Sequence, residues 1–116
     1  MATVVNVKVK NIRPAYSTLS DWMADPRNEY IGRGGVVFID KERFPKKASP
    51  WANPFTVKQH GRDTCLALYE GLVRERIQRE GTGELKKLKG KVLGCWCAPE
   101  ACHGDVLVRI LNEIAD

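Results

Sequence analysis

One segment near the C-terminus constrains the fold of this chain more than any other. Residues 91–97, Lys-Val-Leu-Gly-Cys-Trp-Cys, have the apolar character of a buried strand. A loop with Pro99 follows, and the spacing of apolar side chains at positions 106, 107, 110, 111 and 114 then predicts a final amphipathic helix. A strand that leads into such a helix is typical of α/β architecture.

The rest of the chain alternates between strand and helix patterns. A short helix near residues 19–24, started by Ser17 or Ser20, is ended by Pro26, and three prolines within residues 40–55 predict a loop. The other predicted elements are a strand through Val5, Val7 and Val9, strands over 29–33 and 36–39, a helix over 63–79 and a short basic helix over 84–89. We therefore predict a single small α/β domain over residues 1–116, with a mostly parallel or mixed sheet flanked by helices.

Length and composition exclude several classes of protein. A chain of 116 residues, 43% hydrophobic and 28% charged, is sufficient for one core and too short for two domains with a linker. No stretch approaches the roughly 18 apolar residues of a membrane span. The first residues alternate apolar and charged side chains, unlike a signal peptide, so we expect an intracellular protein that binds no membrane.

Basic residues concentrate in the middle of the chain. Residues 41–91 hold thirteen Lys and Arg against six Asp and Glu, whereas the whole chain carries a net charge of +5. This excess indicates an anionic partner, either a nucleic acid or an anionic small molecule. The alternative is an ordinary solvated surface, because glutamates are interspersed among the cations.

The clearest candidate site lies where the last helix is expected to begin. Cys102, His103, Gly104 and Asp105 would occupy its first turn, where free N–H groups and the helix dipole favour anions and lower the pKa of a thiol. In α/β sheets, ligands bind beyond the carboxyl ends of the strands. We predict Cys102, His103 and Asp105 as catalytic candidates and Gly104 as a ligand-binding residue.

The same cysteines have two alternative roles, and both stay open. Cys95, Cys97, Cys102 and His103 have the ligand number of a structural zinc site, although their spacing is not that of a common zinc finger. Alternatively, the cysteines are small buried hydrophobic residues and His103 caps the helix. We favour no metal and no cofactor. Cys65 is expected to be structural, on the buried side of its helix.

Two further segments are candidates to complete a pocket. Gly32 and Arg33 follow a predicted strand in a turn with three glycines, as a phosphate-binding turn would, although a glycine-rich hairpin gives the same pattern. Trp51 and Asn53 lie in a proline-constrained loop, where an Asn before Pro is a rigid hydrogen-bonding corner. Core packing is the alternative for Trp51.

These segments together resemble the family titled domain of unknown function 4326, found in bacterial, phage and large DNA virus proteins. The resemblance covers residues 28–113 and rests on Tyr30-Ile31-Gly32-Arg33, Asn53-Pro54-Phe55, and a long motif from Leu93-Gly94-Cys95-Trp96-Cys97 through Cys102-His103-Gly104-Asp105-Val106-Leu107. A long, basic stretch from Gly34 to Ser49 is similar to the viral versions. The resemblance implies a shared pocket made by Arg33, Asn53, Cys102, His103 and Asp105, and it implies no activity.

The sequence thus leads to two functional hypotheses. The first is an α/β protein that binds, or binds and processes, a nucleotide or other phosphorylated ligand at a strand-to-helix pocket, with Arg33 holding the anion. The second is a non-catalytic accessory protein that associates with nucleic acid through the basic surface of residues 41–91, with a structural zinc site as an option.

Overall fold

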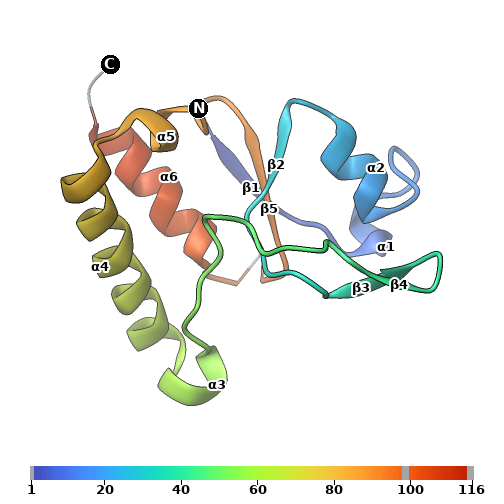
Figure 1. The fold of residues 1–116 in the computed structure, drawn as a ribbon, viewed down its shortest axis with the longest axis horizontal. Helices are drawn as coiled ribbons and strands as arrows, with labels where there is room; N and C mark the ends of the chain where they lie inside the picture. The colour runs from blue at the N-terminus through green and yellow to red at the C-terminus, as the bar shows by residue number, and fades with distance from the viewer. Residues whose placement is uncertain (1, 98–99, 115–116) are drawn as a thin grey trace.

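Three parallel strands form the centre of the computed structural model, which describes residues 2–97 and 100–114. The strands are β1 (Thr3–Asn6), β2 (Asn28–Tyr30) and β5 (Val92–Cys95), in the order β1-β5-β2. Thr3 and Asn28 both align with Val92, so all three carboxyl ends lie at the same edge (Figure 1). The predicted α/β fold with a mostly parallel sheet is confirmed.

Helices cover both faces of this sheet. The long α4 (Arg62–Glu80) and α6 (His103–Glu113) lie on one side, and α1 (Val9–Ile12) and α2 (Leu19–Ala24) on the other (Figure 1). The central strand serves both cores, because side chains alternate along it. Leu93 and Cys95 join the core under α4 and α6, while Val92 and Trp96 pack in the core under α2.

A small antiparallel hairpin stands apart from the main sheet. It consists of β3 (Val37–Ile39) and β4 (Glu42–Phe44), joined by Asp40 and Lys41, both with positive φ. The expectation that residues 40–55 form only a loop is therefore wrong for β4, because Phe44 pairs with Val37 and both pack against the second core. The short helices α3 (Val57–His60) and α5 (Gly83–Lys86) complete the fold.

Several predicted boundaries need correction. The first strand ends at Asn6, and Val9 begins α1 instead of extending the strand. The Asn6 side chain accepts a hydrogen bond from the Lys8 amide at 2.9 Å, which turns the chain out of the strand. Helix α2 is capped by Thr18, whose hydroxyl accepts the Asp21 amide, rather than by either predicted serine. Pro99 lies outside the described residues.

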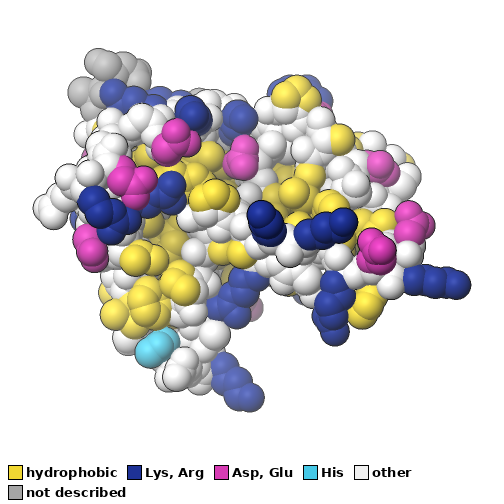
Figure 2. Space-filling model, viewed as in Figure 1, with side chains coloured by type: hydrophobic (Ala, Val, Ile, Leu, Met, Phe, Trp, Pro, Cys, Tyr) yellow, Lys and Arg dark blue, Asp and Glu magenta, His cyan; other side chains and the backbone are white. Residues whose placement is uncertain are grey.

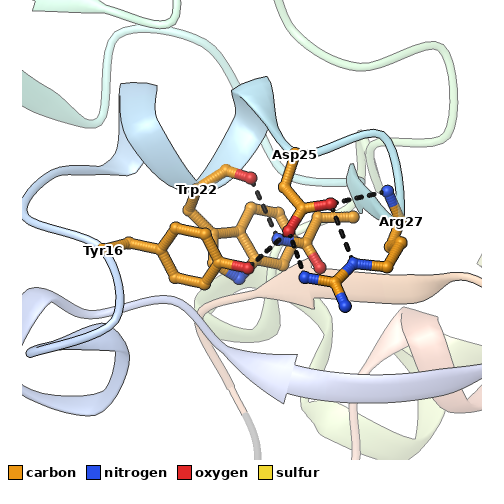
Figure 3. Close-up of polar contacts among 5 residues, drawn as sticks. Tyr16, Trp22, Asp25 and Arg27 are labelled. Carbon is orange, nitrogen blue, oxygen red and sulfur yellow. Dashed lines mark hydrogen bonds and ion pairs between the residues drawn. The ribbon is translucent and has the colours of Figure 1, made fainter.

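The connection from α2 to β2 is held by local polar contacts (Figure 3). The carboxylate of Asp25 accepts hydrogen bonds from the guanidinium of Arg27 and from the phenol of Tyr16, both at 2.7 Å. These two partners, Arg27 first, hold the pKa of Asp25 well below its usual range. Asn28 donates from its side chain to the Trp22 carbonyl, which ties the start of β2 to the helix.

Gly94 permits the close approach of α2 to the sheet. A Cβ atom at this position would lie 2.4 Å from the Trp22 ring and 2.6 Å from Val7. The absence of a side chain at this position of β5 therefore allows the Trp22 ring to contact the central strand. Within the described residues, no helix has the length and apolar character needed to cross a membrane.

Candidate functional site

A hollow of about 240 Å³ opens beyond the carboxyl ends of β2 and β5. Its walls come from the segment after β2, the loop before α3, the start of α4, the segment after β5 and the start of α6. Six of the candidate residues from the sequence line it: Gly32, Arg33, Asn53, Cys102 and His103, together with Cys97 of the zinc alternative. The structure thus brings together residues that lie up to 71 positions apart in the chain.

Cys102 and Asp105 form the N-terminal cap of α6. The Cys102 thiol accepts a hydrogen bond from the Gly104 amide at 3.2 Å, and the Asp105 carboxylate accepts one from the Cys102 amide at 3.0 Å. This reciprocal arrangement is a capping box. Asp105 and Gly104 lie outside the lining of the hollow, and a Cβ at Gly104 would meet Ile31 and Val4 at 3.0 Å. Gly104 therefore serves close packing of α6 on the sheet.

The Cys102 thiol is buried against a second thiol. Its Sγ atom lies 2.9 Å from the Sγ atom of Cys95, and each residue is 1% exposed. The hydrogen bond with Cys95 and burial both raise the pKa of Cys102. Bonds from the Gly104 and Asp105 amides act in the opposite direction and are outweighed. The predicted lowering of this pKa by the helix N-terminus is therefore wrong.

His103 is a buried, neutral imidazole. Its Nε2 atom lies 2.6 Å from the Ile31 carbonyl oxygen, which can only accept, so Nε2 carries the proton and Nδ1 is the acceptor nitrogen. Burial lowers the pKa of His103, and the nearby Arg33 acts in the same direction. The ring of Tyr69 packs against the imidazole edge-to-face at 5.1 Å.

Arg33 and Asn53 shape one wall of the hollow. The Arg33 guanidinium donates to the Asn53 carbonyl at 3.2 Å and to the Phe55 carbonyl at 3.1 Å. The Asn53 side chain accepts the Phe55 amide and donates to the Cys65 thiol, which in turn donates to the Phe55 carbonyl. Cys65 is 1% exposed, so its predicted burial is confirmed. These bonds hold the loop before α3 against α4.

Trp51 lies in the core rather than in the hollow. It is 7% exposed, its carbonyl accepts a hydrogen bond from the Tyr69 hydroxyl at 2.6 Å, and the Arg76 guanidinium stacks over its ring at 4.1 Å. Phe55, from the same loop, does line the hollow. Trp51 therefore packs in the core, which was the alternative to a ligand-binding role.

Two residues of the site, Arg62 and Trp96, carried little signal in the sequence, whereas Cys97 was a candidate there only as an alternative zinc ligand. Arg62, Trp96 and Cys97 line the first hollow and also a neighbouring one of about 460 Å³, whose other walls include Lys8 and Lys10. The Arg62 guanidinium donates to the Ala101 carbonyl and to Glu100. A hydrogen bond with the Cys97 side chain raises the pKa of Arg62. No motif marks Arg62, since only the fold brings the start of α4 next to the end of β5.

The four cysteines are all within the described residues and are free thiols. Cys97 is half-buried, whereas the other three are buried. Across residues 2–97 and 100–114, no three His, Cys, Asp or Glu side chains lie together as metal ligands would. Of the candidate zinc ligands, His103 directs its Nε2 atom at the Ile31 carbonyl oxygen, and Cys102 directs its Sγ atom at the Sγ atom of Cys95.

Comparison with known proteins places these features in a family. The family described as "Domain of unknown function (DUF4326)" matches residues 16–113, which include the whole motif-bearing range. An uncharacterised 12.4 kDa protein of the nrdA-td intergenic region of Enterobacteria phage T4 is 32% identical over 69 residues, covering 55% of this chain and 61% of the phage protein. The uncharacterised protein R718 of Acanthamoeba polyphaga mimivirus is 31% identical over 97 residues, covering 73% of this chain and 67% of the relative. The chain therefore spans about three fifths of the T4 protein's length. No solved structure is significantly similar.

Proposed function

The chain belongs to the domain of unknown function 4326 family, and we propose that it binds a nucleotide-like anion in the two hollows at the carboxyl edge of its sheet. One observation carries this proposal. The hollow that contains His103 and the hollow that contains Lys8 adjoin each other through Arg62, Trp96 and Cys97. A ligand that occupies both would contact Trp96 and Cys97 along its length.

The two hollows differ in chemistry, and the difference suggests the class of ligand. The first is largely apolar and holds the aromatic side chains of Phe55 and Trp96, which suits a flat base. The second holds Lys8, Lys10 and Arg62 with two asparagines and with Glu100, whose carboxylate pairs with Arg62, so the two lysines are the cations that suit a phosphate. Both hollows lie beyond the carboxyl ends of parallel strands, which is the usual position of a ligand in open α/β sheets.

The sequence suggests that Arg33 contacts the anion directly, but in this proposal Arg33 has an indirect role. Its guanidinium is bonded to two loop carbonyls, so it shapes the hollow and contributes positive charge at its rim. The direct phosphate contacts are assigned to the two lysines, because the Arg62 guanidinium is likewise bonded, to the Ala101 carbonyl and to Glu100. Asn53 keeps the loop in place through its bonds to Phe55 and Cys65.

If the bound ligand is processed, Cys97 and His103 are the side chains that we assign to chemistry. Cys97 is the half-buried thiol, faces both hollows and lies beside Arg62. His103 is neutral and offers Nδ1 as an acceptor. Cys102 is a weaker nucleophile than Cys97 in this arrangement, because its thiol is buried against Cys95 and its pKa is raised.

Titration with nucleoside monophosphates, followed by the three tryptophan indole N–H signals in NMR spectra, tests the binding proposal. Trp22 and Trp51 are buried in the two cores, whereas Trp96 lines the hollows, so its signal should move most. The matching nucleosides and inorganic phosphate, titrated separately, report on the two hollows one at a time.

A charge-matched pair of double variants locates the phosphate. Lys8→Gln with Lys10→Gln should weaken monophosphate binding by about tenfold and leave nucleoside binding unchanged, because two exposed cations contribute about 1–2 kcal/mol together. Lys86→Gln with Lys87→Gln removes the same charge at the C-terminal end of α5 and should change neither affinity. If no monophosphate moves the Trp96 signal, or if both double variants act alike, the proposed function is wrong.

A further inference from the structure

The β3–β4 hairpin presents an aromatic ring to solvent. Phe38 is 66% exposed, more than any other large apolar side chain among the described residues. The guanidinium of Arg43, its partner in the opposite strand, lies 4.7 Å from the ring centroid and donates to the Gly35 carbonyl. The ring is thus presented on the surface with the Arg43 guanidinium over one face, which leaves the other face for stacking.

The hairpin is firmly attached to the domain. On the side opposite Phe38, Val37 and Phe44 pack against the core that contains Trp22 and Tyr30. Just before β3, the amide of Gly35 donates to the Pro45 carbonyl at 2.8 Å, and the amide of Val36 donates to the Phe44 carbonyl. Figure 1 shows the hairpin reaching out from the edge of the sheet, beneath α1 and α2. Phe38 is therefore exposed on a strand that is packed against the domain.

The cations around this ring differ from those of the long helix. Arg74, Arg76 and Arg79 of α4 each form ion pairs with glutamates. Lys41, Lys46 and Lys47 are exposed, and within the described residues no carboxylate pairs with any of them. Figure 2 shows Lys and Arg side chains along the hairpin and the segment that follows it. The hairpin also carries Asp40 and Glu42, so residues 36–47 hold four cations against two carboxylates, and three of those cations are lysines without a carboxylate partner among the described residues.

From this arrangement we infer that residues 36–47 bind single-stranded nucleic acid. An exposed aromatic ring gives an unpaired base a stacking surface, and nearby unpaired cations attract the phosphates. In a duplex the bases are stacked on one another, so its phosphates would contact the lysines but no base would stack on Phe38. An anionic lipid surface is a poorer match, since Phe38 and Val36 are the hairpin's only large apolar side chains with more than a third of their surface exposed.

Fluorescence anisotropy with a labelled single-stranded oligonucleotide tests this inference. Phe38→Ala should weaken binding by about tenfold, and Phe38→Trp should retain or strengthen it, because stacking on an aromatic ring is lost in the first and kept in the second. Leu72→Ala, which trims another exposed apolar side chain on α4, is the control and should bind as the parent does. Unchanged thermal melting of each variant establishes that the fold is intact.

The salt dependence of oligonucleotide binding distinguishes the contribution of the Phe38 ring from that of the lysines. Lys46→Gln with Lys47→Gln should reduce the slope of log affinity against log salt by about 1.4, the value for two phosphate contacts on a single strand. Phe38→Ala should leave that slope unchanged, and Lys86→Gln with Lys87→Gln should alter neither slope nor affinity. Duplex of the same length should bind more weakly and be insensitive to Phe38→Ala.

Three outcomes would overturn the inference: no salt-dependent binding of the single strand, equal binding by the parent and Phe38→Ala, or equal losses in the two lysine double variants. Binding to phosphatidylserine vesicles without binding to the oligonucleotide would assign the hairpin to lipid instead. This inference can fail separately from the proposed function: Lys8→Gln with Lys10→Gln, which changes the second hollow, should leave oligonucleotide binding unchanged.

Discussion

The Sγ atom of Cys95, at the end of β5, lies 2.9 Å from the Sγ atom of Cys102, the N-cap of α6. This contact joins the central strand to the helix that follows it and directs the Cys102 thiol into the core. It also explains why a helix N-terminus does not make this thiol acidic. A buried neighbouring thiol and desolvation outweigh the amide hydrogen bonds that would stabilise the thiolate.

Thiol labelling should therefore single out Cys97. With iodoacetamide on the folded protein, followed by peptide mass spectrometry, we expect Cys97 to react fastest and the three buried cysteines to react slowly. Cys97→Ser should remove the fast phase, and denaturant should expose all four thiols. A bound nucleoside monophosphate should slow the labelling of Cys97. Faster labelling of Cys102 than of Cys97 would contradict this description of the site.

Asp105 should matter for stability rather than for ligand affinity. Asp105→Ala removes the acceptor of the Cys102 amide and should lower the free energy of unfolding by about 1 kcal/mol, the usual contribution of a cap. Urea denaturation measures this change, and the titration of the Trp96 indole signal should give the same ligand affinity as the parent. A loss of affinity without a loss of stability would instead support the predicted catalytic or binding role of Asp105.

Gly94→Ala should destabilise the domain by about 1–3 kcal/mol, because the new methyl group would overlap the Trp22 ring and Val7. Gly71→Ala is the matched control, since Gly71 lies in α4 with no neighbour within 4 Å of the added atom. That variant should gain stability by about 0.5–1 kcal/mol from its higher helix propensity. Chemical denaturation of both variants checks the contrast, and equal effects would contradict the close packing of α2 on β5.

His103 should make stability depend on pH in the mildly acidic range. Its pKa is lowered from the ordinary 6.5 in the folded chain, so the unfolded chain takes up a proton first as the pH falls through that value. The free energy of unfolding should then decrease from pH 6.5 downward, until the pH passes the folded pKa.

His103→Gln should remove this pH-dependent decrease, because Gln keeps an N–H donor for the Ile31 carbonyl and does not titrate. The matched variant is His60→Gln, at the exposed second histidine, which should leave the pH dependence as it is in the parent. Denaturation series at several pH values measure the difference. A pH profile for His103→Gln that is identical to that of the parent would show that the imidazole is not buried as described.

Local patterns were sufficient to predict the class of fold and most of its elements. Leu93, Cys95 and the apolar positions of α6 follow strand and helix periodicities, which depend only on neighbouring residues. The same reasoning missed β4, because its pairing with β3 depends on the packing of Phe44 against a core built from α2 and β2. It also extended the first strand to Val9, beyond the turn made by the Asn6 side chain.

The sequence by itself determined the parallel α/β core and the segment where the site begins, because hydrophobic periodicity and turn residues act over a few positions. Only the tertiary structure decided which side chains meet there. It brought Arg62 to Cys97, turned Arg33 toward loop carbonyls and buried Cys102 against Cys95. Burial and charge proximity set the chemistry of such groups, and both arise from contacts between residues that are distant in the chain.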